Sequence, residues 1–298
     1  MQDTPFTFCK REPKAGFAMI PTVGDFLHLI ERIAPMKLAE PWDNPGLQIG
    51  DSEQKIDKIF SSLDPTLDAL MTASEINAQI LFTHHPLIFK SVSHIEINAY
   101  PGHILARAAR RNISVVTAHT NLDVARGGIN DILADLMGLQ NVEVLQPHHN
   151  EPGVGLGRVG DLPEATNLII LANTVKMMLG ADHIRLVGQK ADPIRRVAVV
   201  GGSGGSLISS AARSGADVLI TGDVGHHVAL EAKTLGIAVI DGGHFHTEKT
   251  AFNIFCENLK NFFKKEGWEV GVETDSIQED PTWMTSGIYQ AGKSDGTA

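Results

Sequence analysis

The stretch Ala78-Gln79-Ile80-Leu81-Phe82-Thr83-His84-His85-Pro86 decides the fold of this chain. Its residues 80–83 form a short apolar run without polar alternation, which is typical of a strand covered on both faces of a sheet. A second stretch, Ala216-Asp217-Val218-Leu219-Ile220-Thr221, repeats this pattern in the other half of the chain. The two halves resemble each other, and a duplicated α/β domain is the simplest explanation.

Helices and strands alternate on both sides of these two stretches. In the first half we expect helices at 23–33, 67–77, 103–111 and 129–137, and strands at 56–63, 79–83 and 113–117. In the second half we expect strands at 197–200, 218–221 and 237–240, and helices at 207–214, 227–235 and 250–266. This alternation predicts two similar α/β lobes with mostly parallel sheets.

Composition divides the chain into four parts. Residues 1–20 show no clear period and predict a flexible N-terminal extension, while residues 276–298 predict a polar tail. We expect the first α/β lobe at 21–149 and the second, with a C-terminal helix, at 150–275. The boundary follows from residues 146–164, which are rich in glycine, proline and charge.

The bulk properties exclude several classes of protein. The chain has 298 residues and is 43% hydrophobic, enough to bury the cores of two domains. Its net charge of −10 disfavours a nucleic-acid partner. No apolar run is long enough to span a membrane, and no signal-peptide core is present. Two cysteines, Cys9 and Cys256, are too few for a disulfide framework, so we expect a soluble, cytoplasmic protein.

Side chains that can bind metal follow three of the expected strands. They are His84 and His85, then His119 and Asp123, then His244 and Glu248. Because ligands bind beyond the carboxyl ends of parallel strands, the three segments can form one site built from both halves of the chain. Imidazole and carboxylate suit Zn, Fe or Mn. A single histidine at a strand end is commonly a hydrogen-bonded polar residue, so the metal prediction depends on all three segments. Adjacent His84 and His85 more naturally face two ions than one.

Other histidines have weaker grounds for a role. His226 and His227 follow Gly222-Asp223, and they either contact the ligands or substrate or serve as helix caps and surface residues. His148 and His149 lie in the expected loop between the lobes and are expected to be solvated. His246 lies outside the spacing of its segment and is expected to neighbour the ligands.

Two loops leave alternatives open. The turn at 201–205 follows an expected strand, so its backbone amides can face an anion, but a tight turn that needs positive φ explains the glycines equally well. Trp42 lies in a loop beside Asp43 and Asn44, where it can line a pocket or fix the loop to the core. The second role is the safer prediction from sequence.

Four motifs resemble those of the NIF-three-like family, whose members are often labelled GTP cyclohydrolase 1 type 2 homologues. They are Ala39-Glu40-Pro41-Trp42-Asp43-Asn44-Pro45-Gly46-Leu47-Gln48-Ile49-Gly50, Thr83-His84-His85-Pro86-Leu87, His119-Thr120-Asn121-Leu122-Asp123, and Gly243-His244 with Thr247-Glu248. The motifs occur in the order of the family and cover the chain from about residue 21 to 270. Pro45 replaces the valine usual in the first motif.

The resemblance implies a dinuclear metal centre between the lobes and a ring-shaped homohexamer. The implied ligands are His84, His85, Asp123, His244 and Glu248, with Glu248 bridging two divalent ions. His119 belongs to the matching motif without being among the implied ligands, and we expect it, like His227, to lie beside them.

The ligand set favours a metal-dependent hydrolase that uses a metal-activated water. The family label implies GTP cyclohydrolase-like action on a nucleotide or a related small molecule, although this acidic chain has no strong phosphate-binding loop. The substrate stays unassigned. The alternative is a non-catalytic metal-binding scaffold, a metal carrier or a partner-binding regulator.

Overall fold

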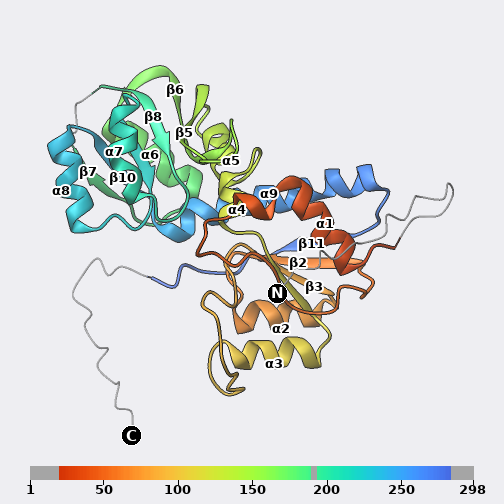
Figure 1. The fold of residues 1–298 in the computed structure, drawn as a ribbon. Coiled ribbons are helices and arrows are strands. Elements are labelled where there is room, and N and C mark those ends of the chain that lie inside the picture. Colours follow the sequence, from red (N-terminus) through yellow and green to blue (C-terminus); the bar gives the residue numbers. More distant parts are fainter. Residues whose placement is uncertain (1–19, 189–192, 283–298) are drawn as a thin grey trace, which may run out of the picture.

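The computed structural model describes residues 20–188 and 193–282 of the chain, which form two α/β lobes (Figure 1). The expected flexible extension lies outside the described residues except for residue 20. Cys9 and residues 283–298 of the expected polar tail also lie outside them.

The first lobe contains a five-stranded sheet in the order β1-β4-β3-β2-β11. Its strands are β1 (Gly46–Ile49), β2 (Lys58–Ser62), β3 (Ile80–Thr83), β4 (Ser114–Thr117) and β11 (Gly271–Thr274). Three of its four pairings are parallel, and only the edge strand β1 runs antiparallel to its neighbour β4. The expected parallel sheet is confirmed here.

Helices cover both faces of this sheet, which explains why its strands lack polar alternation. The helices of the lobe are α1 (Val23–Ile33), η1 (Met36–Leu38), α2 (Leu67–Glu75), α3 (Gly102–Arg110), α4 (Thr120–Val124) and α9 (His244–Glu266). Within β3, Leu81 packs in the core with α2 and α3, whereas Ile80 and Phe82 pack in the core with α1 and α9. Successive side chains of β3 point to opposite faces of the sheet and thus pack into two different cores.

The second lobe contains a six-stranded sheet in the order β5-β6-β8-β9-β10-β7. Its strands are β5 (Gln140–Pro147), β6 (Gly155–Asn167), β7 (Arg185–Val187), β8 (Pro193–Val199), β9 (Val218–Thr221) and β10 (Ala238–Asp241). Its helices are α5 (Ile129–Leu136), α6 (Leu168–Leu179), η2 (Gly205–Leu207), α7 (Ile208–Arg213) and α8 (His226–Leu235). Only β8, β9 and β10 pair in parallel, so the prediction of a mostly parallel sheet is wrong for this lobe.

Helix α9 joins the lobes. It begins beside the second sheet and runs across the first sheet (Figure 1). Its Phe252 packs on Phe82 of β3 with ring centroids 5.4 Å apart, and one hydrophobic core extends from α1 through α9 into the second sheet. Each buried Phe side chain stabilises such a core by about 1.5–3 kcal/mol. The ends of both sheets are therefore held at a fixed separation.

The sheet pairings do not divide the chain at one point. Strand β5 belongs to the second sheet although it precedes residue 149, and β11 returns to the first sheet after α9. Residues 146–164, which we expected to be a loop between lobes, supply the end of β5 and much of β6. None of the helices in the described residues is long and apolar enough to cross a membrane.

Candidate metal centre

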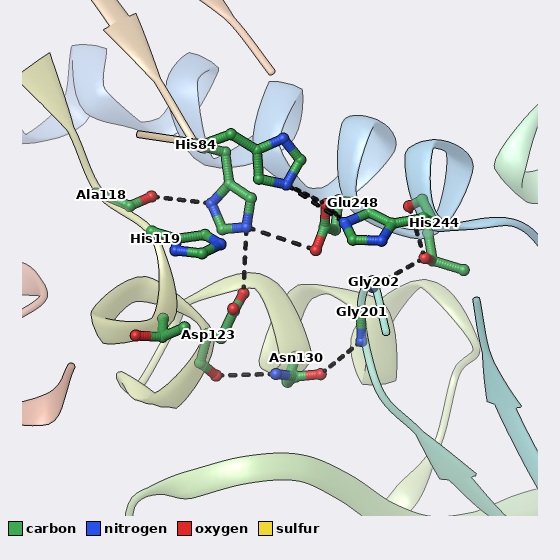
Figure 2. Close-up of polar contacts among 12 residues, drawn as sticks. His84, Ala118, His119, Asp123, Asn130, Gly201, Gly202, His244 and Glu248 are labelled. Atoms are coloured by element: carbon green, nitrogen blue, oxygen red, sulfur yellow. Dashed lines mark hydrogen bonds and ion pairs between the residues drawn. The ribbon is translucent and has the colours of Figure 1, made fainter. Parts of the chain in front are cut away.

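The histidines and carboxylates expected from the sequence meet where the two lobes face each other (Figure 2). His84 and His85 directly follow β3, and Asp123 lies in the short helix α4 that follows β4. His244 is the first residue of α9, and Glu248 lies one turn later on the same face. The segments after β3 and β4 and the start of α9 thus contribute to one cluster.

Parallel pairing of β3 with β4 explains why the first two segments lie together. Thr83 and Thr117 are paired at the ends of these strands, and their hydroxyls are 2.9 Å apart. The chain leaving β4 stays beside β3, since Ala118 N donates to Thr83 O at 3.1 Å. The segments that carry His84 and Asp123 therefore leave the same edge of the sheet.

Glu248 lies at the centre of the cluster. Its Oε1 is 3.7 Å from His84 Nε2, and its Oε2 is 3.1 Å from His85 Nε2 and 3.0 Å from His244 Nε2. His84 Nε2 is also 3.5 Å from Asp123 Oδ1, and the Nε2 atoms of His85 and His244 are 3.3 Å apart. The two oxygens of one carboxylate thus face different histidines.

The other ring nitrogen of each of these histidines donates to a fixed acceptor. His84 Nδ1 donates to Ala118 O at 2.9 Å, and His85 Nδ1 donates to Asp64 Oδ1 at 2.6 Å. His244 Nδ1 donates to Asp223 Oδ2 at 2.7 Å. Such hydrogen bonds fix the orientation of the ring and direct Nε2 toward a shared point, as in many metal sites. Sequence reasoning missed Asp64 and Asp223, although both come two residues after a strand.

Three polar atoms of the cluster are buried without a hydrogen-bond partner among the described residues. They are His84 Nε2, Asp123 Oδ1 and Glu248 Oε2. Leaving such atoms unsatisfied costs about 1–3 kcal/mol each, so the occurrence of three in one cluster indicates a site that can bind a cation. Tetrahedral zinc holds N and O ligands at about 2.0–2.2 Å, which places neighbouring ligand atoms about 3.3–3.6 Å apart. The His85 Nε2–His244 Nε2 and His84 Nε2–Asp123 Oδ1 distances, 3.3 and 3.5 Å, fall in this range, and the contacts of Glu248, from 3.0 to 3.7 Å, lie close to it.

Burial and close charges set the protonation of the cluster. Burial lowers the pKa of His84, so its Nε2 keeps a free lone pair. Burial alone would lower the pKa of His85, but its hydrogen bond to Asp64 and the nearby carboxylate of Glu248 raise the pKa to about 10. Burial alone would also lower the pKa of His244, but Glu248 and Asp223 raise it to about 9. His85 and His244 are therefore imidazolium cations beside the carboxylate of Glu248.

The two carboxyl groups shift in opposite directions. Burial alone would raise the pKa of Glu248, but the close imidazoles of His244, His84 and His85 hold it well below its usual range. Burial and the nearby charge of Glu248 raise the pKa of Asp123. Glu248 is thus the fixed negative charge of the cluster, and a cation can compete for it with the protons on the histidines.

His119 lies against the cluster rather than apart from it. One ring nitrogen from each of His84, His85 and His119 lies within 4.8 Å of the other two, and such a group could hold a metal. His119 Nδ1 donates to Asp43 Oδ1 at 2.7 Å, and Asp43 Oδ2 accepts from Thr120 N at 3.0 Å. These bonds fix the ring beside the expected ligands.

The remaining histidines take other positions. His227 is exposed in α8 and does not line the pocket at the cluster. His148 and His149 directly follow β5, and His149 is exposed. His246 lines a separate cavity, where its Nε2 is 3.5 Å from Asp280 Oδ2.

The glycine turn at 201–205 packs against the cluster and is a tight turn. The amides of Gly201, Gly202 and Gly204 already donate to side-chain oxygens of Asn130, Thr247 and Thr221, at 3.0, 3.0 and 2.8 Å. Gly202 has a φ of +62°, and a Cβ there would collide with the carboxylate of Glu248. Of the two alternatives for this turn, close approach and positive φ explain the glycines.

The cluster opens into a cavity of about 740 Å³ between the lobes. It is lined by His85, His119, His244 and Glu248 at the cluster, by residues of the 201–207 segment, and by Trp42 and Phe89. Trp42 is 56% exposed, so the expectation that it fixes its loop to the core is wrong. Cavities of this size suit small molecules.

Fold and site together define a two-lobed α/β protein with a histidine–carboxylate cluster between the lobes that can hold a metal. The family model described as Duf34/NIF3 (NGG1p interacting factor 3) matches residues 21–281, and the chain belongs to this family. A Clostridium perfringens protein named GTP cyclohydrolase 1 type 2 homolog is 34% identical over 80% of this chain and 91% of its own length.

Solved structures show the same architecture. A Bacillus cereus protein related to NIF3 superposes with a TM-score of 0.84 at 27% identity, over 90% of this chain and 100% of that chain. A Staphylococcus aureus protein superposes with a TM-score of 0.83 at 30% identity, over 89% of this chain and 99% of that chain.

Proposed function

We propose that His84, His85, Asp123, His244 and Glu248 hold two divalent metal ions of the Zn, Fe or Mn type. The buried atoms His84 Nε2, Asp123 Oδ1 and Glu248 Oε2 carry this proposal, since all three belong to the cluster and none has a hydrogen-bond partner among the described residues. A bridging role for Glu248 is supported by its Oε1 facing His84 while its Oε2 faces His85 and His244.

We further propose that the protein is a metal-dependent hydrolase of a small molecule. A divalent metal would supply a Lewis acid and bring the pKa of water near neutrality. The chain's own residues hold the ligand nitrogens in place through Asp64, Asp223 and Ala118 O, so little reorganisation is needed on binding. The adjoining cavity gives a small molecule access to the same point.

The name of the relatives suggests GTP cyclohydrolase-like action on a nucleotide or a related molecule. Among the described residues that line the cavity there is no Lys or Arg, so a phosphate chain would find its positive partners only at the metal and the histidines. We therefore keep the substrate class broad. A homohexameric ring and a cytoplasmic location belong to the same proposal, and light scattering of the purified protein tests the ring.

Hydrolysis by matched variants tests the proposal. Purified protein with Zn, Fe or Mn is assayed against nucleotides and other hydrolysable small molecules. We expect Glu248→Ala to lose metal and activity together, and Glu257→Ala, an exposed change on the same helix, to keep both. Activity that survives in Glu248→Ala without metal would contradict the hydrolase mechanism.

The second candidate is a metal-binding scaffold, carrier or regulator without turnover. It is supported by the histidine orientation, because the Nδ1 bonds of His84, His85 and His244 fix the site before any substrate arrives. Full metal occupancy with no turnover across the substrate panel would favour this candidate over the hydrolase.

A further inference from the structure

Two exposed aromatic rings, Trp42 and Phe89, face the cavity beside the cluster and are called the aromatic wall below. Trp42 is 56% exposed and Phe89 is 49% exposed, and their ring centroids are 5.6 Å apart with an interplanar angle of 50°. Large apolar side chains that stay exposed next to a concave site gain free energy only when a ligand covers them. The aromatic wall therefore indicates a binding surface.

The loops that carry the aromatic wall are held in place by hydrogen bonds. Asn44 Nδ2 donates to Ile88 O at 2.7 Å, and Ile88 N donates to Gln48 Oε1 at 3.0 Å, so the backbone beside Phe89 is fixed to the Trp42 loop. Asp43, the neighbour of Trp42, accepts from Thr120 N at 3.0 Å. The two rings thus belong to one preformed surface, which reduces the entropy lost on binding.

The aromatic wall lies within the reach of one small molecule from the cluster. The ring centroid of Trp42 is 6.0 Å from that of His119, which is 5.4 Å from that of His85. A molecule with one or two fused rings can cover the wall and still place a polar group at the cluster.

The rest of the cavity supplies polar groups that are uncharged or acidic. Its lining includes Glu40, Gln146, Ser203 and Ser206, with no Lys or Arg among the described residues that line it. Away from the cluster, recognition therefore depends on the shape and the π-face of the ligand and on hydrogen bonds to its edge. It does not depend on an ionic partner for a phosphate chain.

We propose that Trp42 and Phe89 bind a planar aromatic or heteroaromatic ring by stacking and determine the substrate class of the site. Because the two side-chain rings are inclined by 50°, the ligand ring stacks on Trp42 and contacts Phe89 with its edge, while the reacting group faces Glu248 and its histidines. This inference rests on the proposed function, for which it names the substrate class. Replacing an aromatic side chain that stacks on a base with alanine weakens binding about 5- to 140-fold.

Calorimetric titration of the full chain with metal present tests this inference. The planar probes are guanosine, uracil and nicotinamide, and 5,6-dihydrouracil is the non-aromatic control for uracil. We expect planar probes to bind, uracil to bind more tightly than its saturated analogue, and Trp42→Ala to weaken planar binding at least about 5-fold. Trp42→Phe keeps a ring and should retain most of the affinity. Met177→Ala, which removes a 76% exposed apolar side chain outside the cavity lining, should change nothing.

Three outcomes would overturn the inference. They are equal affinity of wild type and Trp42→Ala for the planar probes, equal affinity for uracil and dihydrouracil, and no measurable binding of any planar probe at millimolar concentration. A change of oligomeric state in Trp42→Ala without a change in affinity would assign the wall to a subunit contact instead. Metal content measured on the same samples keeps the two proposals separable, because stacking needs no ion. Planar binding by protein that takes up no Zn, Fe or Mn would contradict only the proposed function, and metal-loaded protein that binds no planar probe would contradict only this inference.

Discussion

Replacing Gly202 with alanine should disturb the cluster without replacing any of the proposed ligands. A Cβ built on Gly202 lies 2.9 Å from Glu248 Cδ and 3.2 Å from His244 Nε2, and nearer still to Glu248 Oε1. Ordinary contact begins near 3.4 Å, so Cδ must move by about 0.5 Å and Oε1 by more. Functional sites tolerate about 0.5 Å, and changes next to metal ligands lower affinity about 10- to 100-fold. We expect at least a tenfold loss of metal affinity.

Gly180→Ala is the matched control for this variant. Gly180 has a φ of +63°, against +62° for Gly202, but a Cβ there meets nothing within 4 Å. The left-handed conformation should cost both variants about 1–2 kcal/mol of unfolding free energy, measured in urea. Only Gly202→Ala should lose metal in competition with a chelator. Equal metal affinity of the two variants would refute the contact between the glycine turn and Glu248 as a determinant of the site.

Three further predictions follow from the same geometry. Asp64→Asn removes the carboxylate that orients His85 and should lower metal affinity about 10- to 100-fold by chelator competition; unchanged affinity would contradict that role. Metal affinity should rise as the pH rises from 6 to 9, because His85 and His244, with pKa values of about 10 and 9, must lose protons to bind. Calorimetry in buffers of different ionisation enthalpy should show about two protons released per chain at pH 7. A metal affinity that does not change with pH would be inconsistent with this protonation. Phe252→Ala should lower the unfolding free energy by about 3–5 kcal/mol in urea, since Phe252 is fully buried against Phe82, and a loss below 1 kcal/mol would argue against a shared core.

The parts of the fold that sequence predicts well have strong local patterns. Helix α1 begins at Val23 as expected, because Thr22 caps it with a capping box to Asp25. Strand β3 is predictable because its residues are apolar on both faces, and both faces are covered. Here the local signal and the tertiary environment agree.

The elements that sequence misses depend on tertiary pairing. The hairpin of β5 and β6 contains Gly155 and Gly157 at positive φ, so its sequence has the composition of a loop. The edge strands β7 and β11 are only three and four residues long. The start of α9 is missed because Gly243, at a φ of +81°, precedes it and the helical apolar period becomes clear only after Thr250.

In the candidate site, too, the sequence shows the residues with a strong local pattern but not those that depend on tertiary pairing. His84, His85 and Glu248 could be singled out because they follow apolar strands in patterns typical of metal ligands. The acceptors Asp64 and Asp223 could not be matched to their histidines, since each pairing joins segments 21 residues apart. Only the folded chain shows which nitrogen of each histidine is free.

The most direct test of the metal centre is the number of metal ions per folded chain, measured by elemental analysis on purified protein and on Glu248→Ala. We predict two ions per chain in the wild type and loss of both in Glu248→Ala, since its two carboxylate oxygens face different histidines. A single ion in the wild type would contradict the bridged pair. No bound ion after incubation with Zn, Fe and Mn would contradict the metal centre itself.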